Sequence, residues 1–161
     1  MTKVPQKILT RPKDSPPDPL EHSAKMFDFG YVPAGQDLRD PQLSVGFTER
    51  GKLPPKLCIV GCEFDLLCRE AELFAEKMAS IGSGERAGSE ILWEQNGVRW
   101  EKILGEFHGI SILLNIFYEL LTLSKGFDAM VAFGETKIRT TKRKKVMYDS
   151  VAEWLFREVY V

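Results

Sequence analysis

Proline is absent from most of this sequence, because all nine prolines lie within residues 1–55 of the 161-residue chain. Proline fixes φ and removes an amide donor, so it disfavours helix interiors and central strands. We therefore expect residues 1–55 to form an extended arm and residues 56–161 to form a regular body. The arm carries apolar side chains that predict contact with the body: Met26, Phe27, Phe29, Tyr31, Leu43 and Phe47.

The sequence also lacks an excess of either charge, with 22 basic and 23 acidic side chains and a net charge of -1. With this net charge, the protein has no overall electrostatic field that would attract nucleic acid or an anionic membrane. The basic run between residues 137 and 145 has no aromatic residues interleaved for base stacking, which favours a solvated helix start or linker over a nucleic-acid site. No apolar run approaches the about 20 residues of a membrane span without charge, and the N-terminus has no secretory signal. We expect a cytoplasmic protein.

Cysteine and histidine are scarce as well. Cys58, Cys62 and Cys68 form no C-x-x-C pair and have no neighbouring histidine; the only histidines are His22 and His108. This pattern predicts reduced core thiols, in place of a disulfide framework or a zinc site. Neither a metal ion nor a cofactor is implied.

The sequence of the body predicts an alternating order of strands and helices. Residues 56–62 (KLCIVGC) form a short continuous apolar run after Lys56, which is typical of a parallel strand buried on both faces. Residues 83–97 are rich in Gly, Ser and Glu and predict a loop, and residues 98–104 predict a second strand. Helical spacing predicts one helix between the strands, ending at Gly82, and another near the C-terminus; their apolar residues are Leu67, Ala71, Phe74 and Met78, and Met147, Val151, Trp154, Leu155 and Val159. The order predicts an α/β fold with two parallel strands and flanking helices.

A carboxylate and a histidine follow the two predicted strands. Asp65 comes shortly after the first strand and His108 shortly after the second. The carboxyl ends of parallel neighbours meet at one edge of a sheet, where α/β proteins build their sites. There Asp65 could accept the Nδ1 proton of His108 and stabilise the imidazolium that forms when the ring takes a proton. The alternative is structural, with Asp65 as a helix N-cap for the amides of Leu67 and Cys68. The two roles are compatible.

Several segments together resemble a known family. They are LPP at 53–55, EFDLLCREA at 63–71 and FHG at 107–109, preceded by GYVP at 30–33 and DLRDPQLS at 37–44. With these segments the chain resembles the C-terminal half of the hormone-sensitive-lipase-like branch of the α/β-hydrolase fold, over about residues 10–109 and the final helix. The resemblance implies hydrolysis of carboxylic esters with small or medium acyl chains, with Asp65 as triad acid and His108 as triad base.

The chain departs from that family by lacking a nucleophile elbow. An elbow needs G-x-S-x-G, but the glycine pairs four apart enclose Arg86 and Phe107 in place of serine. No His-Gly-Gly oxyanion loop is present either. The resemblance therefore implies the C-terminal part of a hydrolase sheet whose N-terminal half is missing, and a chain that is inactive alone. The rival interpretation is a non-catalytic binding or scaffold remnant.

Residues 110–126 interrupt the resemblance. Removing them would join His108-Gly109 to Phe127-Asp128 and give the family's His-Gly-Phe-Asp order. They represent either a retained intron or a genuine helical insertion with its own apolar spacing. The expected partners are a small-molecule ester in the complete protein and no nucleic acid. Exposed sheet edges in this fragment would offer a route to self-association.

Overall fold

The computed structural model describes residues 4–16, 30, 32, 34–107, 142 and 145–158. They fall into two units, one within residues 1–108 and one within residues 109–161, which are described separately. The first unit is a mixed α/β structure with an open four-stranded sheet. His22, His108 and the segment 110–126 lie outside the described residues.

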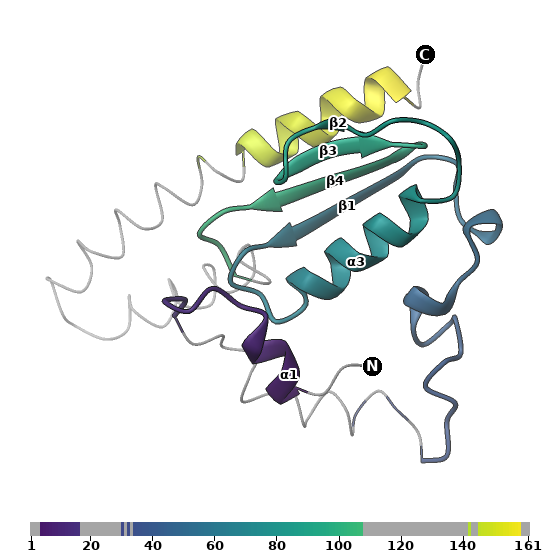
Figure 1. Ribbon diagram of the computed structural model, residues 1–161, viewed down its shortest axis with the longest axis vertical. Coiled ribbons are helices and arrows are strands. Elements are labelled where there is room, and N and C mark those ends of the chain that lie inside the picture. Colours follow the sequence, from purple (N-terminus) through teal and green to yellow (C-terminus); the bar gives the residue numbers. More distant parts are fainter. Residues whose placement is uncertain are drawn as a thin grey trace, which may run out of the picture. The chain divides into compact units, whose positions relative to one another are not determined.

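Two parallel strands form the centre of the first unit (Figure 1). β1 (Leu57–Cys62) pairs with β4 (Val98–Ile103) in a parallel register that runs from Leu57 opposite Val98 to Cys62 opposite Ile103. Both predicted strands and their parallel relation are confirmed. The apolar composition of β1 fits this position, because parallel strands are normally covered on both faces.

The helix between these strands covers one face of the sheet. α3 (Cys68–Ala79) buries Cys68, Ala75, Met78 and Ala79 against Trp93, Val98 and Trp100 of the sheet. Gly61 of β1 allows this packing, since a Cβ at that position would meet the Trp100 ring at 2.6 Å. The predicted helix is confirmed, but Leu67 is 40% exposed because it precedes the first turn.

The prediction that residues 83–97 form a loop is wrong, because the segment contains two strands. They are β2 (Ala87–Gly88) and β3 (Leu92–Gln95), and the complete sheet has the order β1-β4-β3-β2. β3 and β4 are antiparallel and joined by Asn96-Gly97, with φ values of 50° and 75°. Asn-Gly with two positive φ values is the favoured hairpin connection, and this dipeptide was the overlooked signal.

The hairpin turn also anchors neighbouring elements. Asn96 Nδ2 donates to the Ala79 carbonyl at the end of α3, at 2.6 Å, and Asn96 Oδ1 accepts from the Gly84 amide at 2.9 Å. The Leu57 amide of β1 donates to the Gly97 carbonyl at 2.9 Å. One turn thus fixes the end of the helix and the start of both parallel strands.

The arm forms only short helical pieces within its described residues. These are α1 (Val4–Leu9), η1 (Val45–Phe47) and η2 (Arg50–Lys52), as the prolines predicted. The arm contacts the body through polar groups, among them Lys77 Nζ donating to the Gly46 carbonyl at 2.6 Å. Leu53 packs against the core. Phe47, an expected anchor, is 46% exposed, and several other expected anchors (Met26, Phe27, Phe29 and Tyr31) lie outside the described residues.

The second unit contains a helix over residues 145–158, which confirms the expected C-terminal helix over those positions. Trp154 is buried, and Met147, Val151 and Leu155 are half-buried. Within the described part of the chain, no helix has the length and apolar character needed to cross a membrane.

Replacing Gly97 tests the importance of the hairpin turn. Gly97 has a φ of 75°, and a Cβ there would lie 2.5 Å from the Pro55 carbonyl oxygen. We expect Gly97→Ala to lower the free energy of unfolding by about 1–3 kcal/mol in urea denaturation, through backbone strain and this clash. Gly51→Ala is the control, because a Cβ at Gly51 meets nothing within 4 Å. Equal effects of the two substitutions would contradict this account.

Candidate functional site

The segments that follow β1 and β4 remain in contact beyond the ends of the strands. The Phe64 amide donates to the Glu106 carbonyl at 2.9 Å, and the rings of Phe64 and Phe107 lie 5.4 Å apart. Glu63 Oε2 accepts from the Gly105 amide at 2.7 Å. The residue directly before Asp65 therefore touches the residue directly before His108. His108 itself is not among the described residues.

Asp65 is only 6% exposed and has a structural role. Its Oδ1 accepts a hydrogen bond from the Leu67 amide at 2.9 Å, an Asx turn that leads into α3. The expected bond from the Cys68 amide goes instead to the Asp65 backbone carbonyl, at 3.1 Å. The capping prediction is thus confirmed for Leu67 and wrong for Cys68, because α3 begins only at Cys68 and the turn before it uses main-chain groups.

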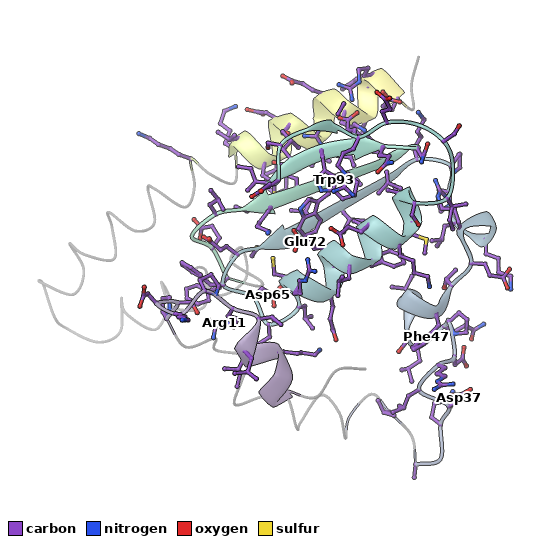
Figure 2. The ribbon with its side chains drawn as sticks, viewed as in Figure 1. Arg11, Asp37, Phe47, Asp65, Glu72 and Trp93 are labelled. Carbon is purple, nitrogen blue, oxygen red and sulfur yellow. The ribbon has the colours of Figure 1, made fainter. Side chains whose placement is uncertain are left out.

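An open, charged pocket of about 300 Å³ lies beside Asp65. It is lined by Thr10, Arg11, Pro12, Glu63, Asp65, Cys68, Arg69, Glu72 and Lys102. Figure 2 shows Arg11, Asp65 and Glu72 near the N-terminal end of α3. The pocket lies near the carboxyl end of β1, where α/β folds place ligands.

The N-terminal arm contributes one wall of this pocket. Arg11 Nε donates to the Phe64 carbonyl at 3.0 Å, and its guanidinium also bonds to the Pro16 carbonyl. Lys7 Nζ forms an ion pair with Glu70 at 2.8 Å. Sequence reasoning missed this contribution, since no spacing in the sequence connects Arg11 to a carbonyl more than fifty positions later.

A three-residue ion network forms the opposite wall. Glu72 of α3 accepts from Arg69 at 2.7 Å and from Lys102 of β4 at 3.0 Å. Burial alone would raise the pKa of Glu72, but the hydrogen bonds from Arg69 and Lys102 outweigh it, so the pKa is lowered. The helix is thereby tied to the strand that leads to His108.

Removing the charge of Glu72 tests this network. Glu72→Gln should lower the free energy of unfolding at neutral pH by about 1 kcal/mol, since charge-assisted hydrogen bonds are lost. Because the pKa of Glu72 is lowered by folding, its contribution is present above the ordinary glutamate pKa and lost as the pH falls through the folded value. The difference between wild type and variant should therefore shrink in urea denaturation at acidic pH.

Glu76→Gln is the matched control, one turn further along α3, since the described residues give Glu76 no salt bridge. A Glu72→Gln effect that stays constant with pH, or that Glu76→Gln reproduces, would contradict the assignment.

The cysteines differ in surroundings. Cys68 is part of the core, whereas Cys58 and Cys62 are half-buried on β1. Burial, followed by the nearby charge of Asp65, raises the pKa of Cys62 to about 11. Burial likewise raises the pKa of Cys68 to about 11. Neither thiol has the lowered pKa that is typical of a nucleophilic cysteine.

Within the described part of the chain, no group of three or more His, Cys, Asp or Glu side chains is arranged to hold a metal ion. In comparisons with known proteins, no family model matches the chain and no curated protein matches it.

Proposed function

We propose that this chain is the C-terminal part of an α/β-hydrolase that cleaves carboxylic esters, with Asp65 and His108 as two members of its triad. The observation that carries the proposal is the junction after the parallel strands. Phe64 contacts both Glu106 and Phe107 there. In the sequence, Phe64 is followed by Asp65, which is buried, and Phe107 is followed by His108.

The chemistry follows from these two side chains. Asp65 would accept the Nδ1 proton of His108 and hold the ring with Nε2 available. His108 would take the proton of a serine as the serine attacks the ester carbonyl, and return it to the departing alcohol as the acyl-enzyme forms. Water then repeats the cycle and releases the acid. The serine and its oxyanion donors would come from the missing N-terminal half, and no metal or cofactor is required.

The helix-turn role of Asp65 does not exclude this function. An ionised carboxylate has two oxygens with about four lone-pair sites. The Leu67 amide occupies one site on Oδ1. A fixed Asx turn also restricts the rotation of the carboxylate, which is useful for orienting a histidine. In the scaffold interpretation, Asp65 only forms the helix turn and does not contact His108. The two interpretations therefore differ in whether the charge of Asp65 affects the protonation of His108.

The titration of His108 distinguishes them. A neighbouring carboxylate favours the imidazolium, so the proposal predicts that the pKa of His108 lies above that of an exposed histidine. Asp65→Asn should then lower the pKa of His108 in an NMR titration of the imidazole protons. Asn keeps a side-chain oxygen for the Leu67 amide, and His22 is the internal control. If His108 and His22 titrate alike before and after the substitution, Asp65 does not orient His108.

Activity of the chain alone is the second test. Loss of the nucleophile from a comparable triad reduces turnover on the order of a millionfold. Hydrolysis of p-nitrophenyl acetate by the chain should therefore equal that of the His108→Ala variant. A burst of p-nitrophenolate that depends on His108 would show that the chain holds its own nucleophile, and the fragment proposal would be wrong.

A further inference from the structure

Arg11 joins the N-terminal arm to the turn that holds Asp65 (Figure 2). Its Nε donates to the Phe64 carbonyl at 3.0 Å, across 53 positions of the sequence, and its Nη2 donates to the Pro16 carbonyl. Within the described residues, the guanidinium bonds to main-chain carbonyls and forms no salt bridge. The donors of a guanidinium lie in one rigid plane, so an arginine that binds two carbonyls holds the two backbone segments in a fixed relation.

The bond to Phe64 fixes the peptide group that leads into Asp65. The carbonyl of this group accepts from Arg11, and its amide, the Asp65 N–H, donates to the Cys62 carbonyl at 3.0 Å. A peptide group is planar, so bonds at both of its polar groups oppose its rotation. The direction in which the chain enters Asp65 therefore depends on Arg11 and on the end of β1.

The other polar groups of Asp65 bond only to the next few residues. Its Oδ1 accepts from the Leu67 amide at 2.9 Å, and its carbonyl accepts from the Cys68 amide at 3.1 Å. These local bonds set the shape of the turn, but they move together with it. The bond from Arg11 comes from a distant segment and therefore also sets the position of the turn.

A second contact docks the arm beside the same turn without using Arg11. Lys7 Nζ pairs at 2.8 Å with Glu70, which lies in the first turn of α3. The Lys7 side chain is only 11% exposed, and a partly buried ion pair is screened less by salt than an exposed one. Lys7 thus holds the arm against α3, which leaves Arg11 to hold the backbone before Asp65.

We propose that Arg11 is a positioning residue of the candidate site, which holds the Phe64 carbonyl so that the Asp65 carboxylate stays within reach of His108. This role rests on the proposed function, in which Asp65 accepts the Nδ1 proton of His108. Such a hydrogen bond needs about 2.6–3.2 Å between its heavy atoms, and neighbouring residues must hold the side chains within about 0.5 Å of the productive geometry. The Asx turn supports Asp65 from the side of α3, and Arg11 supports it from the opposite side.

Two possible effects of Arg11 on His108 have opposite signs. A nearby cation disfavours the imidazolium, so loss of the Arg11 charge alone would raise the pKa of His108. A positioning residue instead maintains the hydrogen bond from His108 to Asp65, so its loss lowers the pKa of His108. An arginine that only fastens the arm changes the pKa of His108 in neither direction. The sign of the change therefore identifies the role.

Arg11→Gln tests the positioning role in an NMR titration of the His108 imidazole protons in the full chain. We expect this substitution to lower the pKa of His108, by no more than Asp65→Asn lowers it. A positioning residue acts through Asp65, so adding Arg11→Gln to the Asp65→Asn variant should lower the pKa of His108 no further. A further lowering in the double variant would overturn the proposal.

Arg50→Gln is the matched control. Arg50 also bonds to two main-chain carbonyls, those of Pro54 and Pro55, at 2.6 Å each, but it does so before the start of β1 and not at its end. Its loss should leave the pKa of His108 unchanged. If Arg50→Gln lowers the pKa of His108 as much as Arg11→Gln does, the effect is a general loss of structure and the positioning role is wrong.

Amide hydrogen exchange tests the backbone contact without using His108. Arg11→Gln should accelerate exchange of the Asp65 amide, because its peptide group is then held at one end only. The Leu57 amide, which donates to the Gly97 carbonyl at the other end of β1, should exchange as in wild type. Unchanged exchange at Asp65, or equal acceleration at both amides, would overturn the proposal.

The titrations distinguish failure of the positioning role from failure of the proposed function. If Asp65→Asn lowers the pKa of His108 while Arg11→Gln leaves it unchanged or raises it, Asp65 orients His108 without Arg11, and only the positioning role is wrong. If Asp65→Asn has no effect on the pKa of His108, the proposed function is wrong, and the positioning role is wrong with it.

Discussion

The parallel pairing of β1 with β4 is the constraint on which the rest of the first unit depends. It requires a crossover from the end of one strand to the start of the next, and α3 with the β2–β3 segment supplies that crossover. Because both strands run in the same direction, their ends meet at one edge, and the contact of Phe64 with Phe107 is the direct result. Without this pairing, the segment that holds Asp65 would not lie against the segment that leads to His108.

Local patterns were sufficient to predict the two parallel strands and the amphipathic helix between them. The strand beginning at Leu57, its partner beginning at Val98 and the helix between them were all identified from composition and spacing. β3 was missed because Gly and Ser around it outweighed the signal of Asn96-Gly97, although that dipeptide is among the strongest short hairpin signals. Local composition misled here because tertiary contacts bury Trp93.

The candidate site was predictable only in part, for a different reason. Asp65 was identified because its position after a strand follows from chain order alone. Arg11 and the network of Arg69, Glu72 and Lys102 depend on contacts between elements distant in sequence. Such pairs leave no periodic trace in a single sequence, since any arginine could meet any carbonyl or carboxylate. The polar walls of the pocket are therefore a property of the fold.

The outer side of β1 bears on what can be assembled beside Asp65. Within the described residues, β1 is paired on one side only, by β4. A parallel neighbour on the other side would bring its own carboxyl end beside the segment that holds Asp65, and α/β folds place their ligands at that edge of the sheet. An antiparallel neighbour would bring the start of its strand there, so the direction of any added strand decides which groups can approach Asp65.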